Sequence, residues 1–174
     1  MTDVPIFVDL QGFIVNDKFT TKEIAVLRNG KELIHHIFRA PISWDLLTKS
    51  EKSRACWLTS NHHQLHWTDG HVDYKLMKTL VRKAVCVEPA SIGTLVYVKG
   101  CEKKKWLAEI LENDVAIETI DADYEDIGCL GTLKASRAFC CGYHAKNCAL
   151  ENVCKLYDWW SERCGQLQDI STIL

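Results

Sequence analysis

The stretch "IFVDLQGFIV", from Ile6 to Val15, is a dense run of β-favouring apolar residues. Such a run, when turn residues bound it, predicts a buried strand. The turn follows at once, because Asn16–Lys18 carries the sequence "NDK". The next segment, "TTKEIAVLRNGKELIHHIFRAP" (20–41), predicts two more strands that meet at the Asn29-Gly30 pair, a strong hairpin signal. The sequence therefore predicts a meander of three consecutive strands.

Helical periodicity begins after this meander and then alternates with strands. The predicted helices and strands are helices at 43–60, at 73–84, at 102–113 and at 147–163, and strands at 94–100 and 115–120. Ser43 and Asp73 are the predicted N-caps of the first two helices. Strands that alternate with helices indicate parallel pairing through right-handed crossovers. We therefore expect an α/β fold with a ribonuclease H-like mixed sheet, three antiparallel strands then two parallel strands, flanked by helices. One domain is expected over residues 4–165, followed by an irregular C-terminal tail over 166–174.

The composition excludes several classes of protein. The chain has 174 residues, 47% of them hydrophobic, and a net charge of −2, as expected for one globular domain with a sizeable core. No apolar run approaches the ~20 residues of a membrane-spanning helix, and the first residues lack the layout of a signal peptide. We therefore expect an intracellular protein, in the cytoplasm or nucleus, whose nine cysteines are thiols or metal ligands. Because the net charge is close to zero, any binding of nucleic acid would have to come from a local basic patch.

Three segments resemble, in order, the motifs of DEDDh exonucleases. "IFVDLQGF" resembles the first motif, an apolar strand with Asp-x-Glu, while "TLVYVKGCEKKKWLAEIL" and "NCALENVCKL" occupy the places of the second and third. Those enzymes hold two divalent metal ions with four acidic residues and use a His as general base. The corresponding residues in this chain are Asp9, Gln11, Lys103, Asn152 and, in the place of the His, Asn147. One carboxylate cannot hold two metal ions, so the resemblance implies an exonuclease fold with no catalytic residues.

A second resemblance is to the MAEL domain of Maelstrom proteins, which keeps this fold without the acids. Its pattern is a Glu on the second strand, then Cys-x-x-His and a further Cys that leads into the last helix. The matching residues are Glu23 in "KEIAVL", Cys141 and His144 in "CGYH", and Cys148 in "NCAL". The resemblance implies a structural zinc and a place in small-RNA silencing.

The spacing of these residues also favours a metal site by itself. Zn²⁺ takes Cys, His and carboxylate ligands tetrahedrally, and Cys141, His144 and Cys148 are compactly spaced. His144 and Cys148 would share one helix face if the helix has begun. Glu23 on the second strand could fill the fourth vertex and so clamp the sheet to the last helix. Two alternatives stay open: Cys140 replaces Cys141 as the ligand, or the cysteines are buried thiols and His144 is a surface residue.

Other polar groups are weaker candidates. Four histidines, with no Cys or acid at suitable spacing, are expected at a surface or along a pocket; they are His62, His63, His66 and His71. The acidic segment "DADYEDI" (121–127) lacks the Gly and the terminal Glu of a Ca²⁺ loop, so we expect it to be solvated. Lys103, Lys104 and Lys105 could contact phosphates, and Trp67 could stack on a base.

These patterns lead to three functional hypotheses. The first is a catalytically inactive exonuclease-like module with a structural zinc that binds single-stranded RNA or a protein partner. The second is an active metal-dependent 3′–5′ exonuclease with a rearranged acidic set, such as Asp9 with Asp121 or Asp123. The third is a pure protein-interaction scaffold. The sequence shows no evident small-molecule substrate and no membrane partner.

Overall fold

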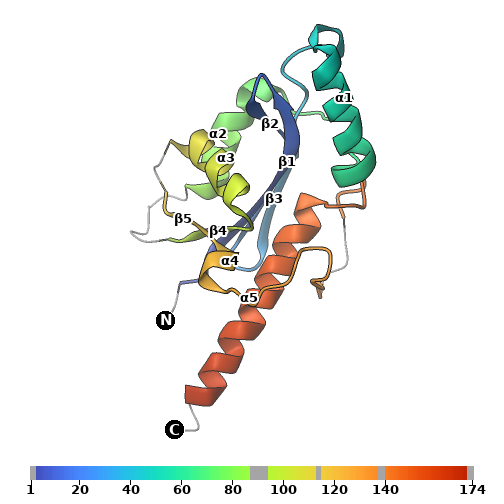
Figure 1. Ribbon diagram of the computed structural model, residues 1–174. Coiled ribbons are helices and arrows are strands. Elements are labelled where there is room, and N and C mark those ends of the chain that lie inside the picture. The colour runs from blue at the N-terminus through green and yellow to red at the C-terminus, as the bar shows by residue number, and fades with distance from the viewer. Residues whose placement is uncertain (1–2, 87–93, 113–114, 137–139, 172–174) are drawn as a thin grey trace.

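The computed structural model describes residues 3–86, 94–112, 115–136 and 140–171, and it is built around a five-stranded mixed sheet (Figure 1). The strands are β1 (Ile6–Val15), β2 (Lys18–Arg28), β3 (Glu32–Ile37), β4 (Val96–Val98) and β5 (Ile117–Thr119). The first three pair in antiparallel fashion, β4 runs parallel to β1 and β5 parallel to β4, in the order β3-β2-β1-β4-β5. The prediction of a mixed sheet with three antiparallel and then two parallel strands is confirmed.

Both hairpins of the meander close with residues in the left-handed region. Asn16 and Asp17 have φ of 50° and 58°, and Asn29 and Gly30 have φ of 53° and 69°. Positive φ at both central residues is typical of the type I′ turn, whose twist matches that of the flanking strands. Gly30 also has a packing reason, because a Cβ there would lie 2.4 Å from the ring of Tyr157. The Asn-Gly signal in the sequence therefore marks the real turn.

Helices cover both faces of the sheet, because successive side chains of a strand point to opposite faces. Val8 on β1 belongs to the core beneath α2 (Met77–Val85) and α3 (Cys101–Leu111). Its neighbour Phe7 belongs to the core beneath α5 (Ala149–Ser171). Figure 1 shows α2 and α3 on one side of the sheet and α5 on the other. The two buried faces explain why β1 reads as a continuous apolar run.

The helix α1 (Lys49–Leu58) lies beside these layers and packs on a third, smaller apolar cluster (Figure 1). That cluster contains Phe13 from β1, Ala55 from α1 and Trp67 from the following loop. A π-helical turn, η2 (Thr59–His63), continues α1 and ends where Gln64 takes the left-handed conformation with φ of 62°.

The start of α1 differs from the prediction that Ser43 is its N-cap. Ser43 precedes only a short 3₁₀ turn, η1 (Trp44–Leu46), and its side chain makes no capping hydrogen bond. The helix begins after Thr48, whose hydroxyl accepts from the backbone of Glu51 while the Glu51 carboxylate accepts from the backbone of Thr48. This capping box satisfies two backbone donors at once, which a lone serine cannot do.

Two further short helical turns lie between the main elements. Asp73 caps η3 (Tyr74–Leu76), which leads directly into α2, so the predicted cap is confirmed. The turn α4 (Ile120–Asp123) follows β5 and occupies the first residues of the acidic segment.

The expected irregular tail from residue 166 is wrong over the residues that the structure describes, because α5 continues to Ser171. A single glycine such as Gly165 costs a helix only about 1 kcal/mol, and no proline follows it. The tail positions 172–174 lie outside the described residues. Among the described helices, α5 included, none is long and apolar enough to cross a membrane.

Candidate metal centre and the cavity beside it

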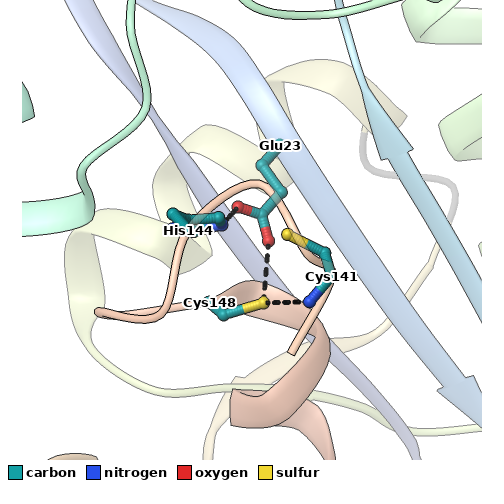
Figure 2. A group of neighbouring side chains, drawn as sticks. All are labelled: Glu23, Cys141, His144 and Cys148. Carbon is teal, nitrogen blue, oxygen red and sulfur yellow. Dashed lines mark hydrogen bonds and ion pairs between the residues drawn. The ribbon is translucent and has the colours of Figure 1, made fainter. Parts of the chain in front are cut away.

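The structure brings Glu23, Cys141, His144 and Cys148 into one cluster (Figure 2). Glu23 lies in the middle of β2, and Cys148 immediately precedes the first residue of α5. Cys141 and His144 lie in the connecting segment 140–148, which curls over the end of that helix. One ligand atom from each residue lies within 4.8 Å of every other. The predicted set of four therefore forms a group that could hold a metal ion.

Burial sets the chemistry of Glu23, which has no exposed surface. Its Oε1 accepts from the backbone N–H of Ala149 at 2.7 Å and lies 3.2 Å from Nε2 of His35. Its Oε2 lies 2.5 Å from Nε2 of His144. Burial by itself raises the pKa of the carboxyl, but the hydrogen bonds to His144 and His35 outweigh it and lower the pKa to about 2. Glu23 is therefore a buried anion that needs a cation.

The orientation of His144 shows whether a metal ion fits the four-residue cluster. Its Nδ1 lies 2.5 Å from the carbonyl oxygen of His63 and 3.0 Å from that of Lys146, so Nδ1 carries a proton and donates it. Its Nε2 then points at Oε2 of Glu23, and unless Nε2 also carries a proton neither of these two buried atoms has a hydrogen-bond donor. With a neutral ring, two acceptors would face each other. The pair therefore requires a second proton on the imidazole or a metal ion between the two atoms.

Both a second proton on His144 and a metal ion between the two atoms have a physical basis. In the metal-free chain burial lowers the pKa of His144, but hydrogen bonds to Cys148 and Glu23 outweigh burial and raise that pKa to about 11. The same hydrogen bond lowers the pKa of the Cys148 thiol against the opposing effect of burial. Around protein-bound metals, a ligating His usually donates the N–H of its other ring nitrogen to a backbone carbonyl or a similar acceptor, as His144 does here. Two sulfurs, one imidazole and one carboxylate suit a thiolate-binding metal rather than Mg²⁺ or Ca²⁺.

Several details differ from what the sequence suggested. His144 is buried, so the alternative of a surface histidine is wrong. Cys140 is exposed and lies outside the cluster, whereas Cys141 belongs to it. His144 does not share a helix face with Cys148, because α5 begins only at Ala149 and His144 lies in the preceding loop. All nine cysteines fall within the described residues, and none of them is joined in a disulfide.

A second polar group surrounds Asp9, which is fully buried on β1. Lys103 from α3 forms an ion pair with one carboxylate oxygen. The other oxygen accepts from Nδ2 of Asn152 at 2.8 Å and from Nε2 of Gln11 at 3.3 Å. The four residues that the sequence resemblance aligned with the acids of the exonuclease motifs therefore meet in space. The ammonium of Lys103 occupies the place beside Asp9 where a cation would bind.

A cavity of about 570 Å³ opens next to this group, between β1, α1 and the start of α3. It forms because β4 pairs only with Ile6 and Phe7, so the rest of β1 has no strand on that side. Its polar and aromatic lining includes Gln11, Trp57, His62, Lys99, Lys103 and Asn147. This volume lies within the range of ordinary ligand pockets, about 300–1,000 Å³. Asn147, which the sequence resemblance aligned with the exonuclease histidine, is thus a lining residue of the cavity.

The residues that the sequence predicted to bind nucleic acid do not gather on one free surface. Trp67 is only 4% exposed, and its indole N–H donates to the carbonyl of Ile42 at 3.0 Å, so its proposed role in base stacking is wrong. Lys103 is occupied by Asp9, and Lys104 lies 3.2 Å from a carboxylate oxygen of Glu118. Lys105 is exposed. The three lysines therefore do not form one free patch.

The aromatic residue that the sequence reasoning missed is Trp57, which is 61% exposed and lines the cavity. It follows the buried Ala55 by two positions in α1, which turns it about 200° away from the packed face of the helix. Helical periodicity could have shown this. A large aromatic residue on the outer face of a helix is the signal.

The remaining candidates have structural partners. The buried His63 lies 3.1 Å from the carbonyl of Gly12 through its Nε2, and burial lowers its pKa to about 4. Asp121 accepts from the backbone N–H of Gly100 at 3.1 Å, and Asp123 accepts from the hydroxyl of Tyr97 at 2.6 Å. Neither aspartate joins Asp9 in a metal-binding group among the described residues.

Comparisons of this chain with protein-family models, with curated proteins and with solved structures found no match.

Proposed function

We propose that this chain is a catalytically inactive, exonuclease-like module that a structural Zn²⁺ stabilises and that binds single-stranded RNA in the cavity beside Asp9. The observation that carries the proposal is the occupied carboxylate. Asp9 is buried and already receives three donors, from Lys103, Asn152 and Gln11. A two-metal nuclease site needs several free oxygen ligands. An open cavity beside a carboxylate that the chain itself neutralises is suited to binding rather than cleavage.

The zinc in this proposal is held by Glu23, Cys141, His144 and Cys148. Tetrahedral Zn²⁺ with about 2.0–2.3 Å bonds accepts this combination of sulfur, nitrogen and oxygen donors. With all four vertices filled by protein, the ion has no open position for substrate, so its role is structural. It would join β2 to the first residue of α5 and contribute directly to folding free energy.

Single-stranded RNA is the favoured ligand because the cavity combines an exposed ring with cations and amides. Trp57 offers a face for stacking, which requires an unpaired base. Lys99 can meet a phosphate, and the side-chain amides of Gln11 and Asn147 can both donate and accept hydrogen bonds. The resemblance to the MAEL domain implies that this RNA binding serves small-RNA silencing. Intracellular location is part of the same proposal.

The test is binding of a fluorescently labelled short oligouridylate, with the same sequence in duplex form for comparison. Trp57→Ala should weaken single-strand binding about 5- to 150-fold, since stacking contributes roughly 1–3 kcal/mol per base. Lys99→Gln should lower both the affinity and its dependence on salt. Lys31→Gln, in the turn at the opposite end of β1, is the matched control and should bind as the wild type does.

Two results would refute the proposal. Mg²⁺- or Mn²⁺-dependent shortening of the RNA that disappears in Asp9→Ala would restore the active-nuclease hypothesis. Absence of RNA binding at low salt would leave the cavity to a protein partner, the alternative that the exposed Trp57 also allows. Elemental analysis of the purified protein should give about one zinc per chain.

A further inference from the structure

The segment 140–148 contains three of the four cluster residues, and it also contacts the helical turn that forms one wall of the cavity. Three of its residues bind the π-helical turn η2 and the residue after it. His144 Nδ1 donates to the carbonyl of His63, and Asn147 Nδ2 donates to the carbonyl of His62 at 2.7 Å. Lys146 donates from its backbone N–H to the side chain of Gln64 at 3.2 Å and from Nζ to the carbonyl of Asn61 at 3.0 Å.

These contacts act as the C-terminal cap of α1 and η2. The last carbonyls of any helix lack donors from within the helix and must find them elsewhere. Here the carbonyls of Asn61, His62 and His63 all receive donors from segment 140–148. One of the donors, His144, is also a member of the metal cluster. The end of this helix is therefore held by the same loop that would hold the ion.

The capped helix end forms one wall of the cavity. Trp57 and Leu58 from the last residues of α1, and His62 from η2, all line it. The body of α1 is weakly anchored, because among its residues only Glu51 and Ala55 are buried. A π-helical turn is often found at functional sites and is a less stable arrangement than a regular α-helix. The position of this wall therefore depends on the cap.

We propose that metal binding at the four-residue cluster regulates the cavity by holding segment 140–148, which in turn fixes η2 and Trp57. The inference rests on the proposed function, because it assigns a regulator to the same RNA site. Without the ion, Cys141 loses its link to Glu23 and the loop is held to the sheet by fewer contacts. The cap loosens, the wall moves, and Trp57 no longer presents its ring in a fixed place. Affinity for RNA and affinity for the metal are then linked, and the linkage acts equally in both directions.

Variants that break the cap but keep the metal ligands separate this mechanism from general unfolding. Gln64→Met and Lys146→Met each remove one contact made by a side chain outside the cluster, and both leave the cavity-lining Asn147 in place. Ser60→Ala, an exposed position in the same turn, is the matched control. All three full-length proteins should retain zinc and the thermal transition of the wild type within a few degrees.

Hydrogen exchange gives a readout that does not depend on RNA. In Gln64→Met and Lys146→Met with zinc bound, amides of residues 57–64 should exchange faster, while those of β1 and β2 keep their wild-type protection. Removal of zinc from the wild type by a chelator should accelerate the same segment. Unchanged exchange at 57–64 in both cap variants would overturn the inference, whether or not the protein binds RNA.

Binding experiments then test the linkage itself. Oligouridylate should bind the zinc-loaded wild type roughly 5- to 150-fold more tightly than either cap variant, the usual range of coupling between sites. Saturating oligouridylate should slow zinc transfer to a chelator in the wild type but not in Gln64→Met. Equal RNA affinity for wild type, control and cap variants overturns the coupling. Failure of the zinc-loaded wild type to bind RNA refutes the proposed function alone, because the exchange experiment still decides whether the metal loop holds the wall.

Discussion

Replacing Cys148 by alanine tests the metal centre most directly. Cys148 is fully buried at the start of α5, and its sulfur lies 3.7 Å from Oε1 of Glu23. The variant removes one of four ligands and, with it, a link between β2 and α5. A matched control exists in the same helix, since Cys154 is only 2% exposed but lies outside the cluster. Cys154→Ala therefore removes a buried sulfur of the same size without touching the metal.

The expected difference follows from linkage. At free zinc a hundredfold above the dissociation constant, binding to the native state adds about 2.7 kcal/mol to the free energy of unfolding. For a chain of this length each kcal/mol shifts the Tm by roughly 2–4 °C. Cys148→Ala should therefore melt about 5–11 °C below Cys154→Ala in zinc. Each tenfold rise in free zinc should raise the Tm of the wild type by about 3–5 °C and leave that of Cys148→Ala nearly unchanged.

Differential scanning calorimetry in zinc buffers measures these shifts. The gap between the two variants should close when a strong chelator is present, because only the loss of the buried sulfur then remains. Cys140→Ala should behave as the wild type does throughout, since Cys140 lies outside the cluster. A Tm of the wild type that is independent of zinc, or equal losses in Cys148→Ala and Cys154→Ala, would refute the metal site and favour the imidazolium–carboxylate pair.

Three further outcomes are expected. Burial, partly offset by the attraction of Asp69, lowers the pKa of Lys22 from 10.5 to about 8, so the folded state loses this proton before the unfolded state does. Urea unfolding should therefore show the wild type gaining stability relative to Lys22→Met as pH rises from 8 to 10.5, by up to about 3 kcal/mol, and losing it as pH falls through 8. Trp67→Ala should destabilise the fold by about 3–5 kcal/mol, whereas Trp57→Ala should leave the Tm almost unchanged. Asp9→Ala should cost about 3 kcal/mol, since it leaves the partly buried ammonium of Lys103 unpaired, and Mg²⁺ should shift the Tm of neither this variant nor the wild type.

Local signals explain why the first half of the fold could be predicted from the sequence. The strand β1 is apolar except for Asp9 and Gln11, and the Asn29-Gly30 pair can adopt the positive φ that a tight hairpin requires. Asp73 caps the turn η3 that leads into α2, as expected, because that hydrogen bond spans only two residues. Where two local signals competed, the stronger prevailed: Thr48 with Glu51 displaced Ser43 as the start of α1.

Contacts between distant residues explain what could not be predicted. The pairing of Glu23 with the segment after Cys140 spans more than a hundred positions, and spacing alone suggested a helix face that the chain does not use. The burial of Trp67 depends on Phe13 and on a carbonyl at Ile42, in a stretch without periodicity. The cap that segment 140–148 forms on η2 has no sequence signature, because its acceptors are backbone carbonyls.

Two buried carboxylates on neighbouring strands share the end of one helix. Glu23 on β2 accepts from the first backbone N–H of α5, and Asp9 on β1 accepts from Asn152 one turn later. The positive end of the helix dipole favours both anions, but burial demands a full compensating charge for each. For Asp9 the ammonium of Lys103 supplies that charge from within the chain. For Glu23 no lysine or arginine forms an ion pair among the described residues, and the groups around it are sulfurs and imidazoles.

The two carboxylates therefore differ in what can replace their cation. The ion pair of Asp9 is complete without an added ligand, so a divalent ion would have to displace Lys103 from a buried site, at a large cost in free energy. The compensation of Glu23 depends on a proton at His144 or on a metal, and a thiolate-binding ion satisfies the two sulfurs as well. For this reason the chain should bind zinc at Glu23 and no magnesium at Asp9. Binding measurements with both ions on the same protein therefore distinguish a structural metal site from a catalytic one.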